Sequence, residues 1–69
     1  MDNNDLQGHP NIVLRGGPAD GRTLDFTPLD ATIELSFGGQ VHSYRPTPDR
    51  DDEYPALTVF AFAGSITAP

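Results

Sequence analysis

The sequence predicts an all-β protein, a small antiparallel five-stranded meander that forms a curled sheet or an open barrel. Five short segments alternate apolar with polar residues or are rich in β-branched and aromatic residues. Glycines and prolines, seven of each, separate these segments, and no window has helical periodicity. The predicted strands cover residues 11–15, 22–26, 32–37, 41–45 and 57–63.

The length of 69 residues allows one domain. We place this β domain at residues 11–64, between a flexible N-terminal arm at residues 1–10 and a flexible C-terminal tail at residues 65–69. A chain of this size buries only about 60% of the surface that it exposes when unfolded. Since it has no cysteine for a disulfide or a thiolate metal site, we expect further burial to come from association with other subunits.

The first two strands are joined by the stretch Arg-Gly-Gly-Pro-Ala-Asp-Gly-Arg at residues 15–22. Pro18 suits the first central position of a type I turn, and Gly21 accepts the left-handed conformation that closes such turns. A regular loop would place the apolar side chains of the first strand opposite polar residues. A bulge at Gly21 and Arg22 removes this conflict by shifting the register by one residue. The predicted pairs are Ile12 with Phe26 and Leu14 with Leu24.

The third and fourth strands are joined by Gly38 and Gly39, which are typical of a two-residue primed turn. This turn fixes the register of the hairpin and assigns one face of it to the core. The predicted core pairs are Ile33 with Tyr44 and Leu35 with His42.

The fifth strand is apolar on both faces. Phe60 and Phe62 share one face, and alternate residues from Leu57 onward form the other. If each phenylalanine buries roughly 150 Å², the two together contribute on the order of 7 kcal/mol at about 25 cal/mol per Å². The chain has no predicted helix to cover such a strand. We therefore expect a barrel wall or another subunit to cover these rings.

Residues 46–55 form a long acidic connection without apolar periodicity, and we predict that it is the most mobile loop. The whole chain has four arginines, no lysine and ten acidic residues, giving a net charge of −6. This charge argues against nucleic acid as a partner. The sequence also lacks an apolar run long enough for a membrane span and the pattern of a signal peptide. We expect a soluble protein without a membrane partner.

Three features invite a catalytic or metal-binding interpretation. Residues 16–23 read Gly-x-x-x-x-Gly-Arg-Thr, but a strand follows where a phosphate-binding loop needs a helix, so a plain turn is favoured. The acids at residues 49–53 lack the spacing of a calcium loop and favour a solvated or partner-facing patch. His42 favours a core-edge histidine bonded to the backbone. Hydrolysis by Asp20 and His42 is a minor alternative, and we predict a non-enzyme without cofactor, metal or catalytic residues.

Three stretches of the chain form a distinctive pattern. They are Ile-Val-Leu-Arg-Gly-Gly-Pro-Ala-Asp-Gly-Arg at residues 12–22, His-Ser-Tyr-Arg-Pro-Thr at residues 42–47, and Tyr-Pro-Ala-Leu-Thr-Val-Phe-Ala-Phe-Ala-Gly at residues 54–64. This pattern resembles small, mostly uncharacterised proteins of actinobacteria and their tailed phages. The resemblance spans residues 11–64 and assigns no active residue. It implies a phage-encoded structural accessory, such as a capsid decoration protein or a minor virion protein. We expect the protein to be located in a virion if it is phage-encoded and otherwise in the cytoplasm.

Such a protein would bind a capsid or other virion subunit, or itself, as a homo-oligomer or as part of a lattice. Its spare apolar surface and arginines would make the contacts. The predicted contact residues are Phe60, Phe62, Tyr44, Arg15, Arg22 and Arg45. The alternative, suggested by the excess of acids, is a small acidic inhibitor of a basic nucleic-acid-binding host protein.

Overall fold

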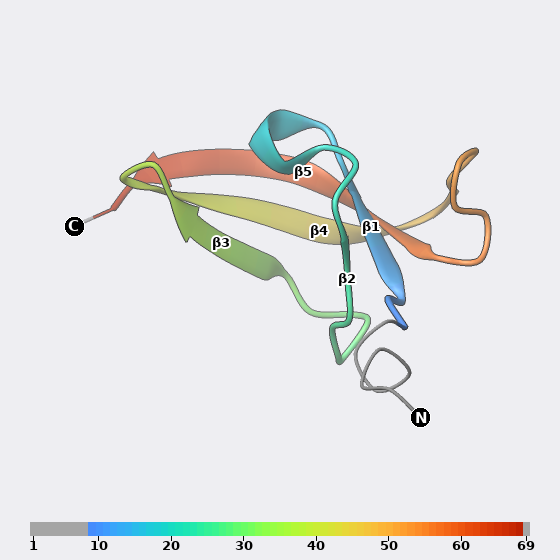
Figure 1. The fold of residues 1–69 in the computed structure, drawn as a ribbon. Coiled ribbons are helices and arrows are strands. Elements are labelled where there is room, and N and C mark those ends of the chain that lie inside the picture. Colours follow the sequence, from blue (N-terminus) through green and yellow to red (C-terminus); the bar gives the residue numbers. More distant parts are fainter. Residues whose placement is uncertain (1–8, 69) are drawn as a thin grey trace, which may run out of the picture.

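A computed structural model describes residues 9–68, which form a single open sheet of five strands (Figure 1). The all-β prediction is confirmed, and the sheet is curled rather than closed into a barrel. No α-helix occurs among the described residues. The elements are β1 (Ile12–Arg15), the 3₁₀ turn η1 (Gly17–Ala19), β2 (Thr23–Leu24), β3 (Ile33–Phe37), β4 (Gln40–Arg50) and β5 (Thr58–Thr67).

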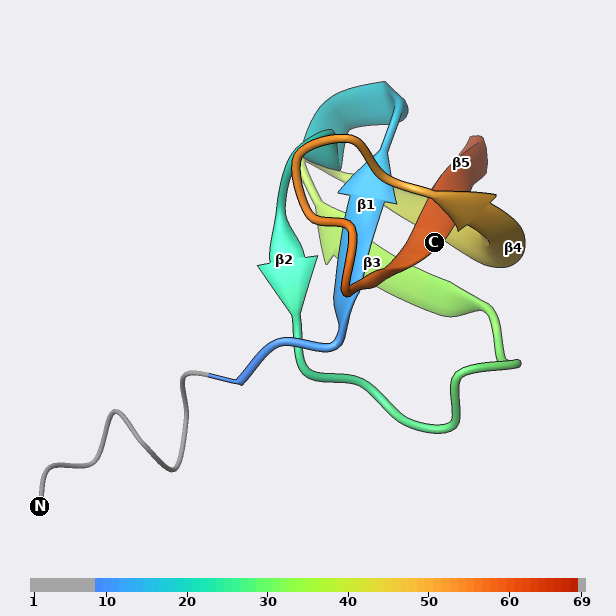
Figure 2. The same ribbon diagram turned by 90° about the vertical axis from the view of Figure 1, so that its right-hand side faces the viewer.

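The order of the strands is β2-β1-β5-β4-β3, so the last strand of the chain lies at the centre of the sheet. β5 pairs antiparallel with β4 and parallel with β1, in a register that places Leu14 opposite Phe60. The sheet is therefore mixed, and the predicted antiparallel meander is wrong in its connectivity. The central position suits β5 because its first half is apolar on both faces. Residues 25–32 connect β2 to β3 at the opposite edge (Figure 2).

The β3–β4 hairpin has the predicted register. Ile33 faces Tyr44 and Leu35 faces His42. The turn residues Gly38 and Gly39 have φ angles of 64° and 77°, as a primed turn requires. This part of the fold follows directly from the two glycines.

The β1–β2 hairpin contains the predicted bulge but not the predicted register. The N–H of Gly21 donates to the Leu14 carbonyl (2.7 Å), and the N–H of Leu14 donates to the Arg22 carbonyl (2.8 Å), so two residues face one. However, Ile12 pairs with Leu24 instead of Phe26. Alternation requires a shift of one residue but does not give its direction, and the observed shift is in the direction opposite to the predicted one.

β4 continues through two prolines to Arg50, five residues beyond its predicted end. A proline is accepted at position 46 because β3 begins at Ile33, opposite Tyr44, and leaves the following part of β4 without a neighbour on that side. Alternation directs the missing N–H of Pro46 to this unpaired side. The register with β5 then becomes irregular between Pro46 and Arg50.

The main core lies on one face of the curled sheet. The aromatic ring of Phe26, in the segment between β2 and β3, packs edge to face on Phe60 at a centroid distance of 6.1 Å. The buried core residues are Ile12, Leu14, Ala19, Ile33, Tyr44 and Phe60, with Leu24, Phe26 and Leu35 packed against them. Val13 and Val59 are also buried, although alternation places them on the opposite face.

Residues 65–68 extend the sheet instead of forming part of the flexible tail predicted at residues 65–69. Residues 64–67 of β5 pair with residues 40–43 of β4, and the N–H of Ala68 donates to the Gly39 carbonyl (3.0 Å). The predicted arm at residues 1–10 lies mostly outside the described residues. No helix in the described part of the chain has the length and hydropathy needed to cross a membrane.

Candidate functional site

Two of the six predicted partner-binding residues lie in the core of the chain. Tyr44 and Phe60 have no exposed surface, so neither side chain is accessible to a partner in this fold. We expected a barrel wall or another subunit to cover the rings of β5. Phe26 and the curl of the sheet cover Phe60, which removes this argument for an external cover.

The hydroxyl group of Tyr44 holds the glycine-rich turn after β1 in place. It accepts a hydrogen bond from the N–H of Ala19 (2.9 Å) and donates one to the carbonyl of Gly16 (2.8 Å). The carboxylate of Asp20 accepts a further bond from the N–H of Gly16 (2.7 Å). The turn is therefore fixed on the end of the core, and these contacts give it a structural role.

Phe62 lies at the border between core and solvent, with 36% of its surface exposed. Its ring packs at 5.3 Å from the ring of Tyr44 and covers the backbone of Gly17. A Cβ atom at position 17 would lie only 2.5 Å from two ring atoms of Phe62. Phe62 is thus held by its own chain while one side of its ring faces outward.

Arg15 is occupied within the chain. Its Nε and Nη2 donate to the two carboxylate oxygens of Asp51 at 2.6 and 2.9 Å, and Nη2 also donates to Glu53 at 3.0 Å. The backbone N–H groups of Glu53 and Tyr54 donate to Asp51 as well. The acidic segment is therefore anchored at Asp51, which is 8% exposed, and the predicted loop at residues 46–55 is shorter than expected because β4 continues to Arg50.

This ion pair has a clear electrostatic effect. The hydrogen bonds from Arg15, assisted by the backbone N–H groups of Tyr54 and Glu53, hold the pKa of Asp51 well below its usual range. The bonds to Asp51 and then Glu53 raise the pKa of Arg15 above its usual value. Both side chains remain charged at neutral pH, and the pair locks the segment after β4 to the end of β1.

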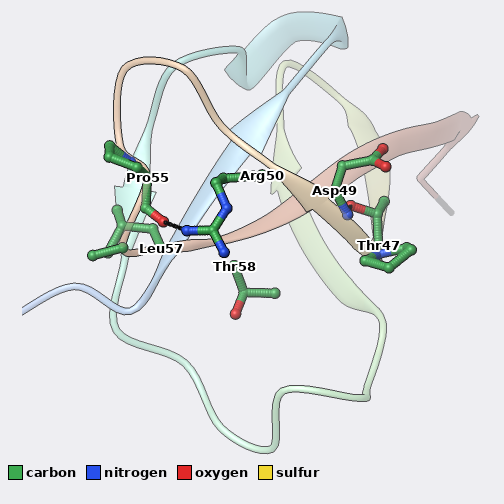
Figure 3. A pocket seen from close by; sticks show the side chains of 8 residues that line it. Thr47, Asp49, Arg50, Pro55, Leu57 and Thr58 are labelled. Atoms are coloured by element: carbon green, nitrogen blue, oxygen red, sulfur yellow. Dashed lines mark hydrogen bonds between the residues drawn. The ribbon is translucent and has the colours of Figure 1, made fainter.

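A shallow hollow of about 380 Å³ lies between the end of β4 and the segment before β5 (Figure 3). Arg50 reaches across it and donates to the carbonyl of Pro55 (3.4 Å), and Asp49 stands on the other side. The hollow offers one cation beside one anion and no nucleophile with an adjacent base. The side chains around this hollow therefore do not provide the nucleophile and base that a catalytic site needs.

His42 is a structural histidine, as predicted. It is 4% exposed, and its Nε2 lies 3.3 Å from the carbonyl of Phe37. Because a carbonyl only accepts, Nε2 carries the hydrogen of this bond, and in the neutral ring Nδ1 accepts from the hydroxyl of Ser65 (2.6 Å). Among residues 9–68 no group of three or more His, Cys, Asp or Glu side chains is placed to hold a metal ion.

The last two predicted contact residues, Arg22 and Arg45, are exposed and form no ion pair with a described residue. Arg45 lines a second hollow, of about 520 Å³, together with Glu34 and Ile66. This hollow lies on the face of the sheet opposite the main core, where alternation places Ser43 and Arg45. Both arginines are therefore accessible for ion pairs with a partner.

The most distinctive surface is the end of the sheet made by residues 35–43 and 62–68, which we term the sheet tip. It contains no Asp, Glu, Lys or Arg, although the chain as a whole has a net charge of −6. Three large apolar side chains are exposed there, Phe37 at 40%, Phe62 at 36% and Ile66 at 66%. In Figure 1 the tip lies at the opposite end of the sheet from the acidic segment that follows β4.

Sequence reasoning predicted Phe62 as a contact residue but missed Phe37 and Ile66. Ile66 was assigned to a loose tail, and Phe37 was assigned to the end of the hairpin without a role. The absence of charge from two separate stretches was the available signal. Its meaning depends on β5 pairing with the start of β4, which brings the stretches together.

Comparisons with protein-family profiles, with curated proteins and with solved structures gave no match.

Proposed function

We propose that this protein is a non-enzymatic structural accessory of phage type, a capsid decoration or minor virion protein that binds a larger protein assembly through its sheet tip. The observation that carries the proposal is the uncharged tip with exposed Phe37 and Ile66. Alternation places Phe37 on the core face and Ile66 on the opposite face, so the tip exposes an apolar side chain on each side. Large apolar side chains exposed at an uncharged end of a small protein are typical of a protein contact. The resemblance of residues 11–64 to small phage proteins supports the same proposal.

Two further residues extend the proposed contact surface, in addition to Phe62, which belongs to the tip and exposes part of its ring. Arg22 and Arg45 are exposed without an ion pair among the described residues. Acidic side chains on a virion subunit would pair with these arginines at the rim of the contact. In this arrangement the apolar tip supplies affinity and the arginines supply orientation.

Quantitative mass spectrometry of purified virions from the phage that encodes the chain tests the proposal. A decoration protein is expected in tens to hundreds of copies per particle, in proportion to a symmetric subunit. Absence from the particles would reject the structural role.

A binding assay on isolated particles then tests the surface. Phe37→Ser and Ile66→Ser should weaken binding at least tenfold, because each removes an apolar contact. Leu29→Ser is the matched control, since Leu29 is also exposed, at 43%, but lies outside the tip. Equal loss in all three variants would contradict a contact at the tip.

A second candidate is a small acidic inhibitor of a basic nucleic-acid-binding protein. It is favoured by the exposed carboxylates of Asp49, Asp52 and Glu53, which lie close together at and just after the end of β4. An inhibitor forms a one-to-one complex, so light scattering of the complex separates the two candidates. Asp49→Asn combined with Asp52→Asn should abolish inhibition and leave particle binding unchanged, because neither residue belongs to the tip.

A further inference from the structure

The outer edge of β5 is unpaired beyond Ala61 in the described chain. β1 pairs with β5 only as far as Arg15 opposite Ala61, whereas β5 continues to Thr67 (Figure 1). On its other side β5 is paired with β4 up to Thr67. The last part of β5 is therefore an edge strand of the sheet tip.

The hydrogen-bond pattern identifies which backbone groups face this free edge. The N–H of Ala68 donates to Gly39 across from it, so Ala68 and, by alternation, Ile66 direct their backbone groups toward β4. The pairing of Ile66 with Val41 of β4 is consistent with this orientation of the backbone groups. The N–H and C=O groups of Ser65 and Thr67 therefore point outward, without a partner in the described chain.

This edge lacks the usual protection against strand addition. Proteins guard exposed edges with charged side chains, prolines or bulges. The outer edge of β3 carries Glu34, and the register shift in β5 precedes Ser65. Residues 65–67 themselves have no charge and no proline, and the exposed side chain of Ile66 stands at their centre.

We propose that two copies of the chain pair through residues 65–67 of β5, antiparallel and about a two-fold axis at Ile66. Ser65 of each copy then exchanges two backbone hydrogen bonds with Thr67 of the other, and the two Ile66 side chains face each other. The pairing joins the two sheets into one. The inference rests on the proposed function only in taking the sheet tip as the contact surface.

Charge favours a second copy as the occupant of this edge. Each copy has a net charge of −6, so two copies approach only where the surface is neutral. The tip meets this condition because the acidic segment lies at the other end of a molecule 42 Å long, several times the Debye length of about 8 Å at physiological salt. A basic partner would instead be drawn to the acidic end.

A single introduced thiol tests the register, because the chain contains no cysteine. In the proposed pairing the two Ile66 residues form a pair without hydrogen bonds, with Cα atoms about 4.5 Å apart, which suits a disulfide. Ile66→Cys should therefore oxidise to a covalent dimer at least ten times faster than Ser36→Cys, its counterpart on the outer edge of β3. Equal rates would overturn the proposal.

Proline substitutions test the edge itself by sedimentation equilibrium between about 10 µM and about 1 mM, a range suited to weak association. The average mass of the unmodified chain should rise toward twice the monomer mass. Thr67→Pro removes an outward N–H without removing a bond to β4 and should abolish the rise. Ser36→Pro does the same on the edge of β3 and should leave the rise unchanged. A constant monomer mass for the unmodified chain would overturn the proposal.

Charged variants give a result that does not depend on one substitution folding well. Ile66→Lys and Ile66→Glu each place like charges opposite each other in the dimer, so each alone should be monomeric. An equimolar mixture should form a one-to-one heterodimer. If the unmodified chain is monomeric while tip variants still lose particle binding, only the dimer fails. If the dimer forms and virions lack the protein, only the proposed function fails.

Discussion

Replacing Gly17 with alanine tests the close packing between η1 and β5. Gly17 has a φ of 64°, and a Cβ atom there would lie 2.5 Å from the Cδ1 and Cγ atoms of Phe62. Gly38, in the β3–β4 turn, has the same φ of 64°, but a Cβ atom added there would meet no atom within 4 Å. Gly38→Ala is therefore a matched control that carries the backbone strain without the overlap.

The magnitudes follow from these two contributions. A left-handed conformation costs an alanine about 1 to 2 kcal/mol, which is the whole effect expected for Gly38→Ala. In Gly17→Ala the ring of Phe62 must also move, and since it is 36% exposed it has room to turn outward. That movement loses its contact with the Tyr44 ring, worth about 0.5 to 1.5 kcal/mol, together with buried area. We expect a total of about 2 to 4 kcal/mol for Gly17→Ala.

Urea unfolding followed by far-ultraviolet circular dichroism measures both variants. A Phe62→Ala background supplies the double-mutant cycle: without the ring, Gly17→Ala should cost no more than Gly38→Ala. If Gly17→Ala and Gly38→Ala differ by less than about 0.5 kcal/mol in the unmodified background, the packing of Phe62 on the turn is not a source of stability.

Two further substitutions have comparable controls. Tyr44→Phe removes two hydrogen bonds and leaves the buried N–H of Ala19 unpaired, which should lower the free energy of unfolding by about 2 to 3 kcal/mol in thermal denaturation. Tyr54→Phe, which loses no hydrogen bond seen in the structure, should change it little, and equal effects would refute the role of the Tyr44 hydroxyl. Asp51→Asn should lower Tm at pH 7, and because the pKa of Asp51 is depressed in the folded state, the gap to the unmodified protein should shrink as pH falls below about 4. Asp52→Asn is the control, and a gap that stays constant with pH would contradict the ion pair as its cause.

Local sequence signals were sufficient for the elements that neighbours in the chain determine. The paired glycines at 38 and 39 set the register of the β3–β4 hairpin, and the conflict between apolar and polar residues located the bulge at Gly21 and Arg22. The sequence could not give the direction of the register shift, because alternation is satisfied equally by one residue either way. That choice depends on how η1 packs on the Tyr44 hydroxyl, a contact between distant residues.

The candidate site was less predictable because it depends on pairings distant in sequence. Arg15 and Asp51 are separated by 36 positions, and only the parallel pairing of β1 with β5 brings them together. Prolines at 46 and 48 indicated a loop, yet the strand continues because its neighbour on that side has ended. The apolar character of β5 was identified correctly, but its cover comes largely from Phe26 and the rest of the same chain.

The central place of β5 has a consequence for how the protein acquires its structure during synthesis. Of the five strands, the one that joins the two hairpins is the last to leave the ribosome. Until residues 58–61 emerge, the two hairpins lack the strand that pairs with both of them, and the buried side of β1 remains open to water. Folding therefore waits for nearly all of the described chain, and a nascent chain that stops earlier exposes the apolar face that the finished sheet conceals.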